Sequence, residues 1–357
     1  MTSAPQTSIR SVTLAENPKI LIIKMSSLGD VIHALPSLYA LRTLYPRGII
    51  HWVVEEAQAP LLPGPPYIDR IYCFPKKDLK TLSPCKIWRT LKKFRSELAV
   101  NKYDLVIDLQ GLAKSALVAL LSGGKVKLGY WEMREGSFLI SRGIKGEHAL
   151  SHVIERYLDV IRFLGPVPGE IVYPLPDYTP QTGRLEKKLK DLGCRRGRLI
   201  VFFPGASWPT KLWPAGHYAR LAQKLTEDGW EIILGGGPGE RDLAETIKSL
   251  SPSVRYCDLV GQTDLRDLMA LAGLAEAAVG SDSGPLHLAT AVGVPTVTLF
   301  GPNSSQRTGT YGPKVTNLMS PAPCAPCFKK TCPGEFICLK EISPQEVYEA
   351  VRKAISK

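Results

Sequence analysis

Short, continuously apolar segments alternate with longer segments of helical periodicity along this chain, and that alternation limits the folds open to it. The apolar segments are rich in β-branched residues, which is typical of strands in βαβ units. LIVFF (Leu199–Phe203) has no polar position, as in strands covered on both faces. The sequence therefore predicts an α/β protein with parallel sheets. We expect strands at 19–24, 49–54, 70–74, 104–109, 125–129, 199–203, 230–234, 277–280 and 296–300.

A proline-rich segment separates the two halves of this pattern. Residues 165–182 contain five prolines, which is typical of a domain boundary. A chain of 357 residues also has the length of two domains, at about 150 residues each. We expect two α/β halves with a cleft between them, and ligands bound at the carboxyl ends of the strands.

Composition excludes several other classes. Hydrophobic residues make up 44% and charged residues 22%, which excludes a disordered chain, a collagen-like chain and a small disulfide scaffold. The longest apolar stretch, 105–121, contains Asp108 and Lys114, so we expect no spanning helix. Residues 1–18 lack the apolar core of a secretory signal. We expect a flexible leader there, and a cytoplasmic protein whose eight cysteines are mostly thiols or metal ligands, not bridges.

The net charge is +12, which suits a phosphate-rich substrate, an acidic membrane surface or a nucleic acid. The basic residues are scattered, so a solvated basic surface is the alternative. The last fifteen residues, Ser343–Lys357, have the pattern of an amphipathic helix. Ser343 is its expected cap, Pro344 fits its first turn and Glu346 completes a capping box.

Three segments of the first half carry polar residues after expected strands. The segment Lys24–Asp30 (KMSSLGD) places Ser26, Ser27, Gly29 and Asp30 on a strand-to-helix turn. It is neither a dinucleotide fingerprint nor a P-loop, and Asp30 is also a plausible helix cap.

The other polar segments of the first half follow the fourth and fifth expected strands. Asp108–Ser115 (DLQGLAKS) supplies a cation at Lys114, and the segment 129–136 contains Arg134. An arginine beside aromatic residues can bind a carboxylate or phosphate through two hydrogen bonds. Taken singly, each segment also fits an ordinary surface loop.

Three loops of the second half have the composition of an anion site. Residues 204–214 carry Ser207 and Lys211, and a glycine-rich turn at 235–240 ends in Glu240, which can accept hydrogen bonds from ribose hydroxyls. The third, GSDSGPLH at 280–287, precedes a helix of small residues, and amides at such a helix start can bind a pyrophosphate. A glycine-rich turn by itself is weak evidence, and a single histidine such as that at 287 is often a core residue. The third loop contributes Asp282, Ser283, Gly284, Pro285 and His287.

Four cysteines lie close together near the C-terminus. They follow the pattern C-x2-C-x4-C-x5-C, whose first spacing is typical of metal sites while the later gaps are looser. Structural zinc, free thiols and an adventitious pair remain open. The four residues are Cys324, Cys327, Cys332 and Cys338.

Together these segments resemble the ADP-heptose:lipopolysaccharide heptosyltransferases, glycosyltransferase family 9. The resemblance is greatest to the type I enzyme, which adds the first heptose to Kdo on lipid A. It covers about residues 19–313. It is carried by KxSSLGD (24–30), HWVVEE (51–56), DxQGLxKSA (108–116), WxxRE (131–135), KxWP (211–214), SDSGPLH (281–287) and FGP (300–302).

The resemblance implies a GT-B fold, in which two Rossmann-like domains face each other across a deep cleft. The N-terminal domain (19–173) would bind the acceptor and the C-terminal domain (184–342) the nucleotide-sugar. Residues 174–183 would link them. The terminal helix (343–357) would cross back to the first domain.

The resemblance also implies an inverting, metal-independent transfer without a cofactor. Asp30 matches the general base, and Lys211 and Ser207 match donor-phosphate contacts. The other donor-binding positions would be Glu240, Asp282, Ser283, Gly284, Pro285 and His287. The acceptor-binding positions would be Ser26, Ser27, Gly29, Lys114 and Arg134.

The implied chemistry agrees with these residue types. The acceptor hydroxyl loses a proton as it attacks, and one carboxylate can accept it. The leaving ADP needs no acid, only donors for its developing charge. The implied partners are ADP-heptose, a Kdo-lipid A acceptor and the anionic cytoplasmic face of the inner membrane, where the enzyme would be peripheral, and not a nucleic acid.

Two departures and several rivals remain. Residues 76–80 (KKDLK) have lysines where the type I pattern often has arginines, and lysine cannot make the same bidentate contact. The cysteine-containing tail resembles other family members, so heptosyltransferase II or another core glycosyltransferase is the alternative. An NAD-dependent dehydrogenase would need G-x-G-x-x-G after the first strand. A non-enzymatic basic nucleotide- or membrane-binding protein and a metal-dependent redox protein are more distant readings.

Overall fold

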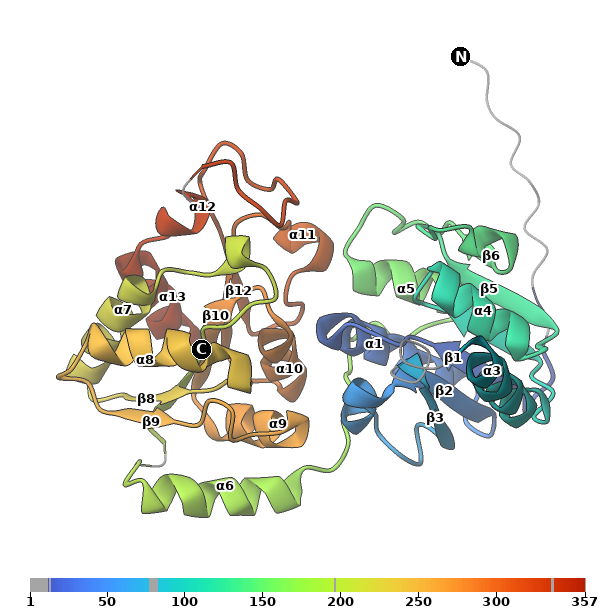
Figure 1. Ribbon diagram of the computed structural model, residues 1–357, viewed down its shortest axis with the longest axis horizontal. Helices are drawn as coiled ribbons and strands as arrows, with labels where there is room; N and C mark the ends of the chain where they lie inside the picture. Colours follow the sequence, from blue (N-terminus) through green and yellow to red (C-terminus); the bar gives the residue numbers. More distant parts are fainter. Residues whose placement is uncertain (1–11, 13, 77–82, 196, 335–336, 357) are drawn as a thin grey trace. The chain divides into compact units, whose positions relative to one another are not determined.

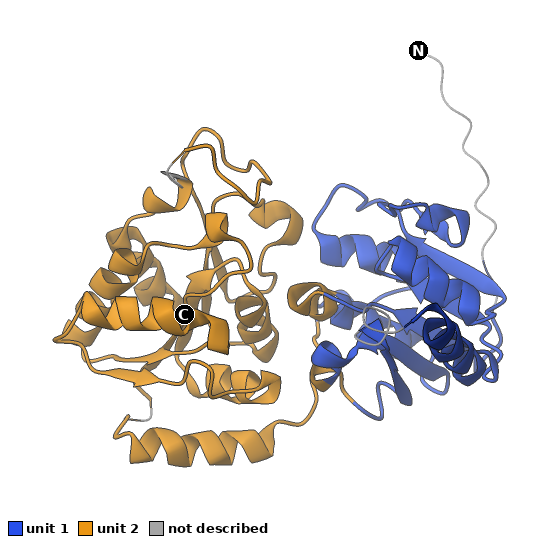
Figure 2. Cartoon of the chain, viewed as in Figure 1, with its two compact units in different colours: residues 1–26, 34–59, 64–171 blue, residues 27–33, 60–63, 172–357 orange. Residues whose placement is uncertain are grey.

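The computed structural model describes residues 12, 14–76, 83–195, 197–334 and 337–356. They form two compact units (Figure 2). The first lies within residues 1–26, 34–59 and 64–171, and the second within 27–33, 60–63 and 172–357. The main division falls inside the proline-rich segment 165–182, while the finer domain limits stay predictions. Most of the expected leader 1–18 and residues 77–80 of the lysine segment lie outside the described residues.

The first unit contains a parallel six-stranded sheet with strand order β3-β2-β1-β4-β5-β6 (Figure 1). In the register of its central strands, Ile22 of β1 lies between Trp52 of β2 and Ile107 of β4. The strands are β1 (Lys19–Ile23), β2 (Ile49–Glu55), β3 (Arg70–Phe74), β4 (Leu105–Asp108), β5 (Val126–Tyr130) and β6 (Arg142–Ile144).

Helices cover this sheet because each presents an apolar stripe to it. Phe94 of α3 and Val118 of α4 pack in one buried cluster with Leu21 of β1 and Val106 of β4. The helical elements of the unit are α1 (Leu28–Leu44), η1 (Glu56–Leu61), α3 (Pro84–Ala99), α4 (Ala113–Leu121), η2 (Ser137–Leu139) and α5 (Val153–Arg162). Two of them are shared, because residues 28–33 of α1 and 60–61 of η1 are grouped with the second unit.

The second unit repeats the same topology. Its parallel sheet has the order β12-β11-β10-β7-β8-β9. Numbered within each unit, both sheets therefore read 3-2-1-4-5-6, the order of a Rossmann fold. The strands are β7 (Leu199–Phe203), β8 (Glu231–Leu234), β9 (Tyr256–Asp258), β10 (Ala277–Ser281), β11 (Thr296–Phe300) and β12 (Val315–Met319).

One large buried cluster of the second unit lies between its sheet and several helices. Phe202 of β7 and Val279 of β10 share a buried cluster with Trp213, Leu221 of α7 and Ile247 of α8. The helical elements are α6 (Thr179–Asp191), η3 (Pro209–Lys211), α7 (Ala215–Glu227), η4 (Pro238–Glu240), α8 (Arg241–Ser249), α9 (Leu265–Leu274), α10 (Gly284–Val292), α11 (Ser305–Thr308), α12 (Ile337–Lys340) and α13 (Pro344–Ile355).

The C-terminal helix α13 packs within the second unit, whereas the sequence analysis expected it to cross back to the first. Its apolar residues Val347 and Val351 are buried in the same cluster as α7, and the hydroxyl of Tyr348 donates to Asp228 at 2.7 Å. The apolar face of the helix is thus already used by this unit. Ser343 accepts a hydrogen bond from the amide of Glu346, as a cap does.

The expected α/β class and GT-B type of fold are confirmed, with three strands more than the sequence indicated. β6 and β9 have three residues each, and every residue of β12 is only half-buried. None of the three forms a continuous apolar run. Within the described residues, no helix is long and apolar enough to cross a membrane.

Candidate functional site

The polar loops of the second half meet at one edge of its sheet. They follow β7, β8 and β10, which are neighbours in the order β10-β7-β8. Because all strands are parallel, their carboxyl ends lie on the same edge. Along the chain, β8 and β9 are added on one side of β7, and β10 to β12 are then added on its other side. Ligands of such sheets bind at the point where this order reverses.

Asp282, directly after β10, is the centre of a buried polar cluster at this edge. Its Oδ2 accepts hydrogen bonds from Nζ of Lys211 and Nδ2 of Asn303, each at 2.7 Å. Its Oδ1 lies 3.3 Å from Nε2 of His287. Burial opposes ionisation, but these partners outweigh it and lower the pKa of Asp282 to about 2. The cluster therefore holds a carboxylate and fixes the ammonium of Lys211 beside it.

The N-terminus of α10 adds hydrogen-bond donors next to Asp282. Ser283 is the cap residue, and Gly284 and Pro285 form the first turn. Helix N-termini present amides and partial positive charge to an anion. The buried Oγ of Ser283 has no hydrogen-bond partner among the described residues. With Lys211, this turn has the composition of a phosphate site.

Glu240 lies at the end of η4, after β8, and packs against the loop that follows β7. A Cβ at Gly205 would collide with the Glu240 side chain, so a larger residue there would force Glu240 out of its present position. Oε2 of Glu240 is buried and, within the described chain, lacks a hydrogen-bond partner. A buried acceptor without a partner is costly, which favours a ligand hydroxyl there. Ser207 is exposed on the same loop as Gly205.

The beginning of α1, which is grouped with the second unit, lies against α10. A Cβ at Gly29 would be 2.8 Å from the His287 ring, and Nε2 of His33 is 3.1 Å from Nδ1 of His287. Asp30 is on this turn, and its Oδ2 accepts hydrogen bonds from the amide and hydroxyl of Ser27, at 2.9 and 2.8 Å. Asp30 thus makes the hydrogen bonds expected of a helix cap, and it lies on the same turn that contacts His287.

The first unit gathers a second polar group at the carboxyl ends of β1, β2 and β4. Nζ of Lys114 donates to Oγ of Ser26 and to Oε1 of Glu55, both at 2.8 Å. Lys76 donates to the other oxygen of Glu55 at 2.6 Å. Burial raises the pKa of Glu55, but the hydrogen bonds from Lys114 and Lys76 outweigh it and lower the pKa overall. The side-chain oxygen of Gln110 fixes the loop by accepting a hydrogen bond from the amide of Ser26.

The described contacts hold Arg134 near this group through its backbone. Its amide donates to the carbonyl of Gly111 at 2.8 Å, and the amide of Ala113 donates to Glu135 at 3.1 Å. The Arg134 side chain is exposed. Segments 108–115 and 129–136 therefore lie side by side, as two strands neighbouring in the sheet require.

Two polar residues of the motifs have structural roles. Nζ of the buried Lys24 donates to the carbonyl of Leu109 and the hydroxyl of Tyr157, at 3.0 and 2.8 Å. Asp108 is fully buried, and its carboxylate accepts hydrogen bonds from the amide of Gly111 and the hydroxyl of Ser115. These contacts hold the loops in shape.

Sequence reasoning did not single out Asn303 or Glu55. Asn303 follows the FGP segment at the end of β11, and Glu55 ends β2 within the HWVVEE segment. The available signal was position, because polar residues directly after buried strands lie at the binding edge.

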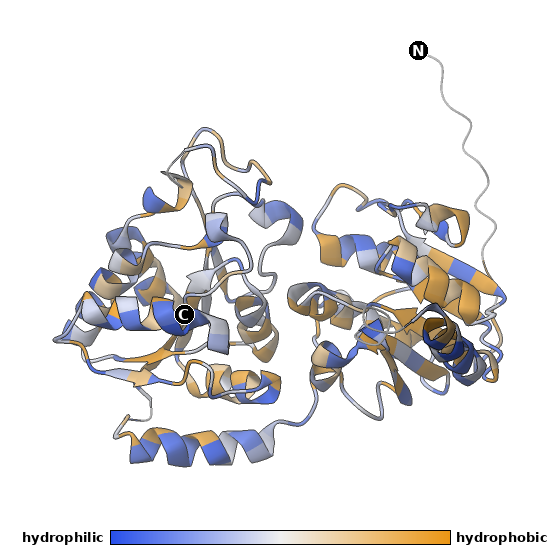
Figure 3. Ribbon diagram, in the orientation of Figure 1, coloured by the Kyte–Doolittle hydropathy of each residue, from blue (hydrophilic) through white to orange (hydrophobic). Residues whose placement is uncertain are grey.

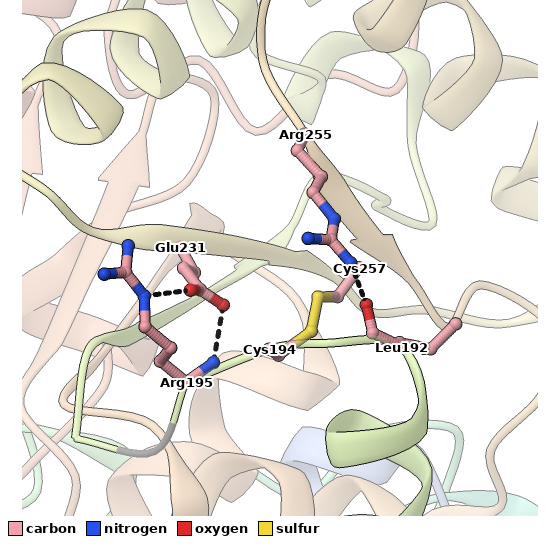
Figure 4. Close-up of a disulfide and its surroundings, with 6 residues drawn as sticks. All are labelled: Leu192, Cys194, Arg195, Glu231, Arg255 and Cys257. Carbon is pink, nitrogen blue, oxygen red and sulfur yellow. Dashed lines mark hydrogen bonds and ion pairs between the residues drawn. A yellow bond between two sulfur atoms is a disulfide. The ribbon is translucent and has the colours of Figure 1, made fainter.

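Cys194 and Cys257 are the exception to the expectation that the cysteines are mostly thiols or metal ligands and not bridges. They form a disulfide that joins the segment after α6 to β9, with Cα atoms 7.0 Å apart (Figure 4). A carboxylate oxygen of Glu231 lies within 4.8 Å of both sulfurs, but it is bound by Arg195 at 2.8 Å. The paired sulfurs offer no thiolate to a metal ion. The other six cysteines are free.

A family model for glycosyltransferase family 9 (heptosyltransferase) matches residues 91–337. The chain belongs to glycosyltransferase family 9. This family 9 chain is 32% identical to lipopolysaccharide heptosyltransferase 1 of Pseudomonas aeruginosa, over 88% of this chain and 87% of the relative. Membership shows that the protein is a glycosyltransferase.

Solved structures agree with the fold of this family 9 glycosyltransferase. The Escherichia coli heptosyltransferase WaaC with ADP is 26% identical, with a TM-score of 0.73, covering 94% of this chain and 99% of that one. WaaC with ADP-2-deoxy-2-fluoro heptose is also 26% identical over the same shares, with a TM-score of 0.71. The E. coli ADP-heptose LPS heptosyltransferase II is 25% identical, with a TM-score of 0.72 over 95% and 98%.

Proposed function

We propose that this enzyme transfers heptose from ADP-heptose to a Kdo residue of the Kdo-lipid A inner core of lipopolysaccharide, with inversion and without a metal ion in the reaction. The observation that carries the proposal is the Asp282 cluster, which holds Lys211 next to the N-terminus of α10. Support for the sugar and acceptor comes from the relatives, two of which are named for lipopolysaccharide heptose transfer.

We assign the donor to the carboxyl edge of the second sheet. Lys211 and the first turn of α10 neutralise the diphosphate, whose charge grows as the glycosidic bond breaks. Glu240 accepts hydrogen bonds from the ribose hydroxyls through its unpartnered Oε2. Ser207 contacts the phosphates from the loop after β7. These fixed cations and amides supply the charge stabilisation that a metal ion supplies in other transferases.

Asp30 is the proposed general base. The acceptor hydroxyl attacks the anomeric carbon from the face opposite ADP, and Asp30 removes its proton during the attack. The hydrogen bonds from Ser27 hold the carboxylate in one orientation. Since the turn of Asp30 reaches His287, the base belongs to the same unit as the donor residues.

The acceptor residues are proposed at the carboxyl edge of the first sheet, together with the turn that carries Asp30. Lys114 and Arg134 supply the positive charge that a carboxylate-bearing, phosphorylated glycolipid needs. Ser26 is held for this task by Lys114. Ser27 and Gly29 complete the set. Gly29 has no side chain, so its turn can lie close to His287.

We further propose that the first unit docks on the anionic inner-membrane surface from the cytoplasmic side. α4 contacts both α3 and η2, and its colouring in Figure 3 is mainly hydrophobic. Exposed basic residues on α3 lie close to exposed apolar ones, which suits an anionic lipid surface. The exposed apolar residues are Trp88, Leu117, Leu120, Phe138 and Leu139, and the exposed basic ones are Lys86, Arg89, Lys92, Lys93 and Arg95.

Sedimentation with vesicles tests the docking. The Trp88→Ala/Arg89→Ala/Lys92→Ala variant is expected to lose most of its binding to vesicles containing anionic lipid. The control Lys187→Ala/Lys190→Ala changes exposed lysines of α6 in the second unit and is expected to bind like the wild type. Equal binding by all three proteins would contradict docking through α3.

Release of ADP tests the activity. ADP-heptose and Kdo2-lipid A are mixed with the full chain in the presence of EDTA, and acceptor-dependent ADP release is measured. We expect turnover by the wild type and a roughly hundredfold or greater loss in Asp30→Asn, with unchanged affinity for ADP. Asparagine keeps an oxygen for Ser27, so the cap is largely retained.

Asp177→Asn is the matched control, because Asp177 also accepts an amide hydrogen bond, from Thr179 at the start of α6. It is expected to turn over normally. Equal rates in wild type and Asp30→Asn would contradict the base assignment, and a kcat lowered by EDTA at saturating ADP-heptose would contradict metal independence of the reaction. Release only with an already heptosylated acceptor would reassign the enzyme to type II.

A further inference from the structure

The segment between β12 and α12 is held in an unusual way. Residues 320–334 contain no helix or strand, and few of their apolar side chains are buried. Such a long irregular loop in a compact domain needs another source of stability. The free thiols of this segment and of α12 are Cys324, Cys327, Cys332 and Cys338.

All four thiols line one small cavity. Its volume is about 190 Å³, and Thr210 and Pro302 form part of its wall. Cys338 is buried, Cys327 and Cys332 are half-buried and Cys324 is exposed. Four cysteines spread over residues 324–338 therefore border one shared space.

The chemistry of the lining is that of a thiolate metal site. Four cysteines, two of them spaced C-x2-C, form the tetrahedral ligand set that zinc prefers in structural sites. Four thiolates around a divalent ion carry a net charge of about −2. Lys329, which lines the cavity, and its neighbour Lys330 supply positive charge to balance it.

The cavity adjoins the candidate donor site. The hydroxyl of Thr210 donates to the carbonyl of Lys329 at 3.0 Å, and the amide of Phe328 donates to the carbonyl of Pro302 at 2.7 Å. The ammonium of Lys330 lies 5.4 Å from the centre of the Trp208 ring. The cysteine loop thus holds the two segments that carry Lys211 and Asn303.

Those two segments supply partners of Asp282. Lys211 follows Thr210 directly, and Asn303 follows Pro302 directly. Both side chains donate to Oδ2 of Asp282 at 2.7 Å. A link across the cavity would fix both donors at once, without taking part in the transfer reaction.

We propose that these four cysteines bind one zinc ion as a structural tetrathiolate site, which fixes the loops carrying Lys211 and Asn303. Among the described residues, no three of these sulfurs lie within 4.8 Å of one another. Metal binding would therefore require the four sulfurs to lie closer together than they do here. The site goes beyond the proposed function, and its occupancy is measured without any substrate.

Metal analysis of the full chain, purified without chelators, tests the site. We expect about one zinc per wild-type chain and almost none in Cys324→Ser/Cys327→Ser. The control Cys73→Ser/Cys85→Ser removes two exposed free cysteines of the first unit and is expected to retain the metal. The metal-free protein is expected to bind ADP about tenfold more weakly, since Lys211 is less well fixed.

Cobalt titration of metal-depleted wild-type protein keeps the test valid if the serine variant does not fold. One Co²⁺ per chain with the charge-transfer absorption of tetrahedral thiolate coordination supports the site. One iron per chain, lost in the same variant, would keep the tetrathiolate site and change its ion. Wild type that neither contains nor binds a thiolate-preferring ion, or metal retained by Cys324→Ser/Cys327→Ser, would overturn the proposal.

Discussion

Nζ of Lys211 lies 2.7 Å from Oδ2 of Asp282, and both side chains are nearly buried. Lys211 follows β7 and Asp282 follows β10, the two strands between which the second sheet changes its direction of growth. The fold thus brings together two residues 71 positions apart. Because the ion pair fixes the ammonium of Lys211 at the edge where a diphosphate would bind, little reorganisation is needed on binding.

Replacement of Asp282 by Asn should destabilise the protein. The change leaves the buried ammonium of Lys211 without its carboxylate, and removal of one partner of a buried pair is costly. We expect the free energy of unfolding in urea to fall by about 2 to 3 kcal/mol. Asp177→Asn, at an exposed site, should change it by less than about 0.5 kcal/mol. A fall in Asp282→Asn no larger than in this control would contradict the structural role of the pair.

The same pair should make stability depend on acid pH. The pKa of Asp282 is about 2 in the folded protein, below its ordinary value of 3.8. A carboxylate with a lowered pKa stabilises the fold above the unfolded pKa, and that stabilisation, here about 2 kcal/mol, disappears as the pH falls toward 2. Unfolding of wild type and Asp282→Asn between pH 6 and pH 2 measures it. The difference between them should shrink as the pH falls, and a constant difference would refute the assignment.

Glu240→Gln should weaken ADP binding through the ribose. A hydrogen bond to a charged acceptor contributes about 1.5 to 3 kcal/mol, so calorimetry should show a roughly 10- to 100-fold increase in Kd. The matched ligand is 2′,3′-dideoxy-ADP, which lacks the ribose hydroxyls. Wild type and Glu240→Gln should bind it equally. If the variant loses the same affinity for both ligands, Glu240 does not contact the ribose.

The sequence predicted the sheets where strands are long and apolar. All nine expected strands are present, because runs such as LIVFF are buried on both faces. β9 (YCD) was not predicted, because three residues are too few to show an alternating hydrophobic pattern. Its pairing with β8 is what identifies it as a strand. The disulfide between Cys194 and Cys257 spans 63 positions, and no local pattern links its ends.

The candidate site was predictable as a set of loops but not as a set of contacts. Polar residues after β7, β8 and β10 are visible in the sequence, and parallel strands bring them to one edge. The partners of Asp282 come from different segments, namely η3, α10 and the loop after β11. Asn303, in that loop, has no motif of its own. Glu55 was not predicted either, because the two lysines that bind it lie 21 and 59 positions away in the sequence.

Replacement of Lys114 by Met should affect the acceptor and not the donor. Lys114 binds Ser26 and Glu55 in the first unit, whereas the proposed donor residues belong to the second. We expect the KM for Kdo2-lipid A to rise about tenfold or more, with an unchanged Kd for ADP. Lys125→Met is the control, because Lys125 is an exposed lysine bound to Asp104. Weaker ADP binding in Lys114→Met would contradict the division of roles.

Loss of the Cys194–Cys257 disulfide should reduce stability without affecting ADP binding. The bridge closes a loop across 63 positions, for which the chain-entropy model gives at most about 4 kcal/mol. Dithiothreitol should therefore lower the free energy of unfolding of the wild type by about 2 to 4 kcal/mol. It should have no effect on Cys194→Ser/Cys257→Ser, which is the matched control. Alkylation of the denatured, unreduced wild type should modify the six free cysteines. Modification of all eight would show that the bridge is absent, and an equal response of both proteins to the reductant would place its effect elsewhere.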